Sequence, residues 1–120
     1  MKKLLYVSLL VMFVCGVAGI ANAKNLTYKE VKDHIGEKVT VCGEIKDEMD
    51  LGTATLLGMG VEIMSQDITC VGIEVDSAIA DKLPEGHYVG KTICVTGEVY
   101  ENPNGGGSIK VTEMSQIKVK

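Results

Sequence analysis

The segments 46–52, "KDEMDLG", and 101–107, "ENPNGGG", carry most of the side chains in this chain that could hold a cation. The candidates are Asp47, Glu48, Asp50, Glu101, Asn102 and Asn104. Clustered carboxylate and amide oxygens suit a hard cation such as calcium. They also suit a basic partner surface, and they repel phosphate. The alternative is a pair of solvated acidic turns that bind nothing, because the glycines at 105–107 would weaken a preformed cage.

The residue combinations of common catalytic sites are missing from the sequence. His34 and His87 are isolated, and no Ser/His/Asp or Cys/His arrangement can be assigned. The segment "NGGG", 104–107, lacks the lysine and the following helix that a phosphate-binding loop requires. No C-x-x-C-H motif is present for haem attachment. We therefore expect a non-enzyme without a bound cofactor.

A soft-metal site is the remaining metal hypothesis. Segment 24–120 contains four methionines, Met49, Met59, Met64 and Met114. Their thioether sulfur atoms suit monovalent copper. The sequence shows no compact cluster of histidine and methionine, and it contains no tryptophan. Scattered methionines more often fill gaps in a core. Copper binding is therefore the lowest of the alternatives.

The first 23 residues have the pattern of a secretory signal peptide. Lys2 and Lys3 precede an apolar run from Leu4 to Ile20, and Ala21-Asn22-Ala23 supplies a small-x-small site. Cleavage is expected between Ala23 and Lys24, which predicts a secreted or periplasmic protein. An uncleaved membrane anchor is the alternative reading, because the run approaches the length that spans a bilayer.

The charge of segment 24–120 argues against nucleic acid. Without Lys2 and Lys3 the segment has 10 lysines against 16 acidic residues, a net charge of −6, and the whole chain contains no arginine. Its aromatic residues are Tyr28, Tyr88 and Tyr100. Affinity for nucleic acid rests largely on cationic contacts to phosphate and on aromatic stacking. A single-stranded nucleic-acid binder is therefore an alternative and not the first choice.

Periodicity and capping signals divide this segment into short elements. Thr27 and Glu30 have the spacing of a capping box and predict a short helix that ends at Gly36. Alternating apolar residues predict three strands, a brief helix follows Asp76, and two more strands complete the chain. The expected strands are 38–45, 53–64, 68–75, 91–99 and 108–111, with an extension at 116–119.

This order predicts a mainly β protein, a five-stranded OB-fold Greek-key barrel. A short helix lies between strands three and four, and another helix lies at the N-terminus of the domain. The order also explains why "IGEKVTVCGEI", 35–45, is nearly repeated in "VGKTICVTGEV", 89–99. In this barrel the first and fourth strands are antiparallel neighbours that must coil sharply, which Gly43 and Gly97 permit.

The segments 34–45 and 89–119 resemble bacterial OB-fold domains of the tRNA-anticodon-like type. The matching features are a glycine-led G-K-x-V-x-V-x-G-x-V strand, a loop, a further strand and a closing Q-I. The resemblance implies a binding module. It is a signature of fold, and many functions share this barrel.

Three cysteines remain in segment 24–120, an odd number for an oxidising compartment. Cys42 and Cys94 occupy matching phases of the two look-alike strands, and directly opposed residues bring β-carbons within about 4.5–5.5 Å. We expect a Cys42–Cys94 disulfide. The alternative is three reduced cysteines that act as small hydrophobic residues.

The sequence thus predicts a signal peptide at 1–23 and one OB-fold domain at 24–120. The expected function is that of a non-catalytic binding module whose ligand is a protein, a polymer or a cation at the acidic loop end. OB-folds present ligands on strands two and three, between the loops that join strands one to two and four to five. Tyr100 would lie at the rim of that surface.

Overall fold

The computed structural model describes residues 24–120. The predicted signal peptide lies outside the described residues. The strands are β1 (Lys24–Thr27), β2 (Lys38–Asp50), β3 (Ala54–Met59), β4 (Val71–Asp76), β5 (Thr92–Glu101), β6 (Gly107–Val111) and β7 (Ile117–Val119). The 3-10 turns are η1 (Tyr28–Asp33), η2 (Ile63–Ser65), η3 (Ser77–Lys82) and η4 (Met114–Gln116). Within 24–120, no helix has the length and apolar character needed to cross a bilayer.

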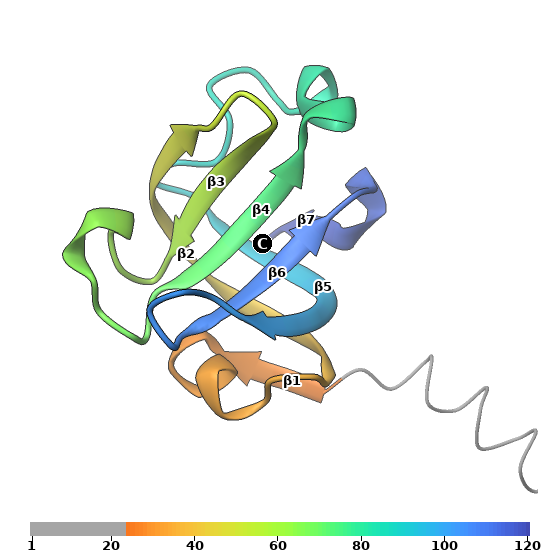
Figure 1. Ribbon diagram of the computed structural model, residues 1–120. Coiled ribbons are helices and arrows are strands. Elements are labelled where there is room, and N and C mark those ends of the chain that lie inside the picture. Colours follow the sequence, from red (N-terminus) through yellow and green to blue (C-terminus); the bar gives the residue numbers. More distant parts are fainter. Residues whose placement is uncertain (1–23) are drawn as a thin grey trace, which may run out of the picture.

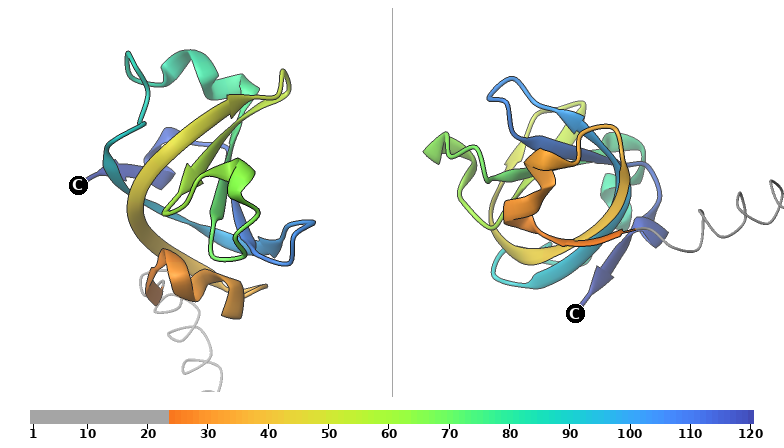
Figure 2. Two further views of the ribbon diagram at one scale, coloured as in Figure 1. Left: turned by 90° about the vertical axis from the view of Figure 1, so that its left-hand side faces the viewer. Right: turned by 90° about the horizontal axis from the view of Figure 1, so that it is seen from below.

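Five of the strands close into a barrel (Figure 1). The order is β2-β3-β4-β6-β5, and β5 returns to pair with β2. The β4–β6 pair is parallel and the other barrel pairs are antiparallel. Seen from below, the strands form a ring with η1 across its opening (Figure 2). The predicted five-stranded OB-fold barrel is confirmed.

The two look-alike segments form the β2–β5 ladder that closes the barrel. Val41 pairs with Val95 and Cys42 pairs with Cys94, in the predicted antiparallel register. Gly43 lies opposite Ile93, and Gly97 lies opposite Val39, so the two glycines sit at opposite ends of the ladder. The repeated sequence therefore corresponds to two adjacent strands with the same coiling.

A disulfide joins Cys42 to Cys94 across this ladder, as the sequence predicts. Their Cα atoms are 4.0 Å apart, and the bond closes a loop with a sequence separation of 52 residues. Cys70 is a free thiol. The covalent link therefore holds together the two strands whose pairing closes the barrel.

The barrel interior is filled by alternate residues of each strand. Val39, Val41 and Ile45 of β2 and Ile93 and Val95 of β5 are fully buried. Similar inward positions come from the end of β5 and from the other barrel strands: Val99, Leu57, Met59, Val71, Ile73, Val75, Ile109 and Val111. This period of two leaves the intervening side chains on the outer surface of the barrel.

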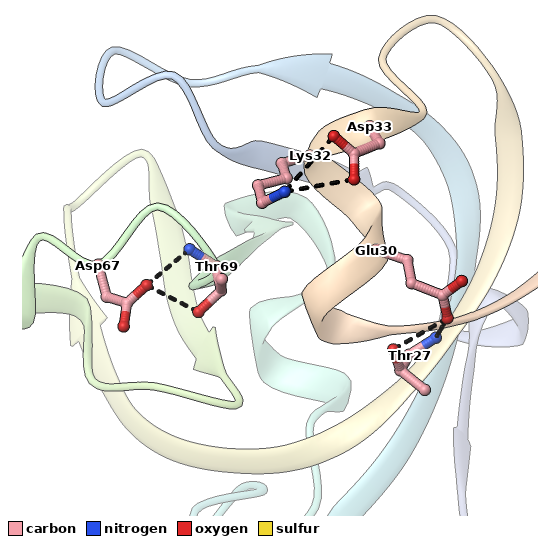
Figure 3. A network of polar contacts seen from close by, with 6 residues as sticks. All are labelled: Thr27, Glu30, Lys32, Asp33, Asp67 and Thr69. Carbon is pink, nitrogen blue, oxygen red and sulfur yellow. Dashed lines mark hydrogen bonds and ion pairs between the residues drawn. The ribbon is translucent and has the colours of Figure 1, made fainter.

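The segments predicted as helices form 3-10 turns. At η1, the Glu30 carboxylate accepts hydrogen bonds from the backbone N–H and the hydroxyl of Thr27, both at 3.0 Å (Figure 3). These bonds hold the pKa of the Glu30 carboxyl below its usual range. Lys32 and Asp33 form an ion pair of 3.2 Å on the same turn (Figure 3). Val31 is fully buried, so this turn covers one end of the barrel.

The structure corrects the predicted boundaries in four places. The strand predicted at 38–45 continues to Asp50, so residues 47–50, which were expected in a turn, pair with β3. The strand predicted at 53–64 ends at Met59, because Gly60 has a φ of +84° that a strand cannot contain. Residues 63–65 then form η2, and the next strand begins at Val71 and not at residue 68. Strand β1 was not predicted; it pairs in parallel with β2 through four residues. Its burial pattern exposes three of these residues, which leaves little periodic signal.

Candidate functional site

A cleft of about 310 Å³ lies on the outer surface of the barrel. Its floor comes from outward-facing positions of β3, β4, β5 and β6: Leu56, Gly72, Glu74, Tyr100 and Ser108. Neighbouring strands place these residues side by side, since Leu56 pairs with Glu74 and Tyr100 pairs with Ser108. The floor includes β3 and β4, the second and third barrel strands, where ligand binding is expected.

Three connecting segments form the walls of the cleft. The β2–β3 turn contributes Leu51, the β3–β4 segment contributes Ile63 and Cys70, and the β5–β6 loop contributes residues 102–104. The β3–β4 segment and the β5–β6 loop project from the same side of the barrel (Figure 1). They also touch, because a Cβ on Gly106 would lie 2.6 Å from the backbone oxygen of Ile68. The β5–β6 loop therefore meets the β3–β4 segment and not the β2–β3 turn, which was the loop predicted to flank the site with it. The β2–β3 turn lies toward the other end of β3, where Ala54 pairs with Asp76, whereas the β5–β6 loop lies beside Ser108, which pairs with Gly72.

Asn102 fixes the conformation of the β5–β6 loop. Its Oδ1 accepts hydrogen bonds from the backbone N–H groups of Asn104 and Gly106, both at 3.0 Å. Its Nδ2 donates to the Ser108 hydroxyl at 3.3 Å. Asn102 is thus a structural residue of the loop, with its amide oxygen already occupied by two donors.

Two aspartates order the β3–β4 segment. Asp67 Oδ1 accepts from the backbone N–H of Thr69 at 2.9 Å and from its hydroxyl at 2.7 Å (Figure 3). The backbone bond is the main cause that holds the pKa of the Asp67 carboxyl below its usual range. Asp47 of β2 accepts from the backbone N–H of Ile63 at 3.1 and 3.2 Å. The wall that carries Ile63 and Cys70 is therefore held by hydrogen bonds within the segment and by hydrogen bonds to strand β2 of the barrel.

Glu74 and Tyr100 form the polar centre of the floor. The Tyr100 hydroxyl donates to Glu74 Oε2 at 2.6 Å. Burial, followed by this bond and the charge of the carboxylate, raises the pKa of Tyr100 above its usual range. The phenol consequently remains a protonated donor. Lys110 pairs with Glu74 in the strand register, yet its ammonium forms no ion pair within 4.0 Å among the described residues.

Three exposed apolar side chains lie in the segments that form the walls of the cleft, and together we call them its rim. Leu51 is 50% exposed and lines the cleft, and Met64, next to the lining residue Ile63, is 73% exposed. Ile68, whose backbone touches the β5–β6 loop, is 45% exposed. These three are half of the exposed large apolar side chains within 24–120. An apolar group of this kind beside a cleft is typical of a binding surface.

The charge of the cleft is negative. Glu74 is the one ionised side chain in its lining, and no lysine or histidine of residues 24–120 lines it. The charges of Asp47 and Asp67 act on Cys70 in the wall, which places two more carboxylates close to that wall. The arrangement can accept hydrogen bonds and cover apolar groups, and it opposes the approach of a phosphate.

The predicted cation ligands do not form one cluster. Asp47 binds the backbone of Ile63, Glu48 pairs with His87 at 2.6 Å, and Asp50 accepts from the backbone N–H of Gly52. Glu101 ends β5 with its side chain exposed. Of these candidates, Asn102 and Asn104 line the cleft. Among residues 24–120, no three His, Cys, Asp or Glu side chains are grouped so that they could hold a metal ion.

The methionines considered for copper occupy unrelated environments. Met59 is fully buried in the core, and Met114 packs against the core from η4. Met64 is exposed at the rim of the cleft. Two of the four therefore contribute to packing, the usual role of scattered methionines.

Sequence reasoning missed most of the residues that line the cleft. Tyr100 was expected at the rim and instead forms part of the floor. Glu74 and Leu56 could have been found, because they occupy outward phases of strands whose inward residues are apolar. The sequence could not have identified Ile63 and Cys70 as lining residues. They belong to an irregular segment whose apolar residues have no periodic pattern.

Cys70 lines the cleft with a poorly reactive thiol. Its S–H donates to the backbone oxygen of Val61, with a distance of 3.2 Å between the two atoms. Burial, followed by the charges of Asp47 and Asp67, raises the pKa of the Cys70 thiol to about 11.

We expect Cys70 to react with iodoacetamide at pH 8 about a hundredfold more slowly than a cysteine in an unstructured peptide. A raised pKa favours the neutral thiol, so the rate should keep increasing as the pH rises toward about 11. Mass spectrometry of alkylated protein between pH 7 and 10 measures this rate. A rate equal to that of the peptide would contradict the prediction.

Comparison with solved structures supports the fold assignment. The chain is similar to asparaginyl-tRNA synthetase from Pyrococcus horikoshii, with a TM-score of 0.54 and 22% identity over 78% of this chain. It spans 22% of the length of that synthetase. It is also similar to the OBody AM3L09 bound to hen egg-white lysozyme, with a TM-score of 0.56 and 16% identity over 80% of this chain and 93% of the OBody.

These similarities show the OB-fold and leave the ligand open. No protein-family model matches the chain. No curated protein matches it in sequence.

Proposed function

We propose that this chain is a secreted, non-catalytic OB-fold module that binds a polypeptide in the cleft over β3 and β4. The observation that carries the proposal is the composition of the cleft. Exposed apolar side chains, Leu51 in the lining and Met64 and Ile68 in the β3–β4 segment that forms a wall, accompany a floor whose one charged group is the Glu74 carboxylate. Apolar anchors around a small polar centre are the usual make-up of protein-binding surfaces.

The same composition disfavours the nucleic-acid alternative. A strand of nucleic acid needs cationic side chains along its phosphates, and the cleft lining within 24–120 contains no lysine. Tyr100 is the one aromatic residue in the lining, and its hydroxyl is bound to Glu74. Stacking of successive bases requires more than one such platform.

Two further observations support the proposal. The OBody, an OB-fold of similar size to this chain, is bound to a protein, hen egg-white lysozyme, in its solved structure. The Cys42–Cys94 disulfide is of the kind that persists in oxidising compartments, which supports export of the chain. Export also agrees with the signal peptide predicted at 1–23.

A comparison of two variants tests the proposed site. Leu51→Glu places a charge on the rim of the cleft, whereas Val119→Glu places the same charge at an exposed apolar position on β7. The exported protein and both variants are immobilised and exposed to envelope and secreted proteins of the source cell, and retained proteins are quantified by mass spectrometry. We expect a partner that wild type and Val119→Glu retain and that Leu51→Glu loses at least about tenfold.

The outcomes separate the two functional classes. Partners retained equally by Leu51→Glu would contradict binding at this cleft. Fluorescence anisotropy with a labelled single-stranded DNA of about 15 nucleotides addresses the alternative. Salt-sensitive binding that Leu51→Glu weakens would replace the polypeptide by nucleic acid as the ligand.

A further inference from the structure

The cleft is small and has one charged group. Its volume of about 310 Å³ is at the lower end of ligand pockets, which span about 300–1,000 Å³. A space of this size accommodates one inserted side chain and part of its neighbours. The chemistry of that side chain is therefore set by the few groups at the floor.

The floor favours a positive charge. The carboxylate of Glu74 is held by Tyr100 through Oε2, and Tyr100 is the one hydrogen-bond donor to Glu74 among the described residues. Oε1 is consequently left for a second donor. Asp47 and Asp67 add negative charge beside the wall at Cys70. Lys110, the partner of Glu74 in the strand register, lines a second hollow together with Glu74 and forms no ion pair with it within 4.0 Å.

The walls suit an aliphatic stem. Leu51 and Ile63 line the walls, and Leu56 and Tyr100 form part of the floor. A lysine side chain lays its methylene groups along such apolar surface while its ammonium reaches a polar partner. The aromatic ring can add a favourable cation–π interaction with that ammonium.

We propose that the cleft receives a lysine side chain of the bound polypeptide, with its ammonium on Glu74 Oε1 beside Tyr100 and its apolar neighbours on the rim. This inference rests on the proposed function and names the chemistry of the ligand. An ammonium suits the site better than a guanidinium, because Tyr100 already occupies Oε2 and hinders a bidentate pair.

Three peptides test the inference at low ionic strength. They are acetyl-Leu-Lys-Leu-amide, the same peptide with norleucine in place of lysine, and the same peptide with arginine. Norleucine keeps the aliphatic stem and removes the charge. Titrations of the exported protein are followed by ¹⁵N-resolved NMR shifts. We expect the lysine peptide to bind at least about tenfold more tightly than the norleucine peptide, with shifts at residues 70–74 and 100–108.

Two variants assign the preference to Glu74. Glu74→Gln keeps an acceptor for Tyr100 and removes the charge, so we expect the preference for lysine to disappear while the norleucine peptide binds as before. Glu98→Gln removes the same charge from an exposed position outside the cleft and should retain the preference. The spectra of the free variants show whether the barrel is intact.

Each contrary result has a separate meaning. Equal binding of the lysine and norleucine peptides to wild type overturns lysine recognition and leaves polypeptide binding in place. Tighter binding of the arginine peptide overturns the choice of an ammonium. Absence of shifts with all three peptides also overturns the inference, whereas the proposed function is decided by the comparison of Leu51→Glu with Val119→Glu.

Discussion

Replacing Cys42 and Cys94 together by alanine is expected to lower the free energy of unfolding by about 4 kcal/mol. The bond closes a loop with a separation of 52 residues, and breaking it releases that constraint on the unfolded chain. A domain of this size has a total stability of about 5–15 kcal/mol, so the loss is a large fraction of it. Guanidinium unfolding followed by circular dichroism measures the change.

Cys70 provides the matched control for this experiment. Cys70→Ala removes a thiol that forms no disulfide, and its effect should be about 1 kcal/mol or less. Addition of a reductant to wild type should reproduce the loss seen in the double variant. An unfolding midpoint that is unchanged by reductant would contradict a stabilising role for the bond.

Replacing Gly60 by alanine is expected to destabilise the barrel by about 3–4 kcal/mol, for two independent reasons. Gly60 has a φ of +84°, which a residue with a Cβ rarely adopts. The added Cβ would also overlap the ring of Tyr28, which packs against the core from η1. The ring cannot withdraw without uncovering the end of the barrel that η1 closes.

Gly90→Ala separates the two reasons. Gly90 has nearly the same φ, +86°, but a Cβ there would have nothing within 4 Å. Its substitution should cost only the backbone strain, about 1 kcal/mol. Thermal or guanidinium unfolding of both variants gives the difference. Equal losses at the two positions would show that contact with Tyr28 contributes nothing.

The sequence predicts those parts of this fold that depend on periodicity. Val39, Val41, Ile93 and Val95 alternate with polar residues, and this pattern yields the β2–β5 ladder and its disulfide in the correct register. The pattern also determines the register of the two strands, because a shift of the pairing by one residue would turn every apolar side chain outward. The position of the cleft over β3 and β4 follows in turn from the topology of the barrel.

The composition of the site was predicted much less well. The acidic residues at 47, 48 and 50 looked free to bind a ligand, yet each holds a backbone or side-chain partner within the domain. Such local hydrogen bonds leave no periodic signal and depend on loop conformation. Ile63 and Cys70 enter the cleft only because the β3–β4 segment folds back over the barrel surface.

The free thiol at Cys70 has a consequence for oxidative folding. Cys70 is 28 residues from Cys42 and 24 from Cys94, whereas the native pair is separated by 52. Loop closure costs about 0.6 kcal/mol more for each doubling of loop length, so in an unfolded chain either bond to Cys70 forms more readily than the native one. Correct pairing therefore requires that β2 and β5 align before oxidation, or that a disulfide isomerase reshuffles the early bonds. Wherever this chain is oxidised, one of these two routes has to operate, the first through fast folding and the second through a catalyst in the same compartment.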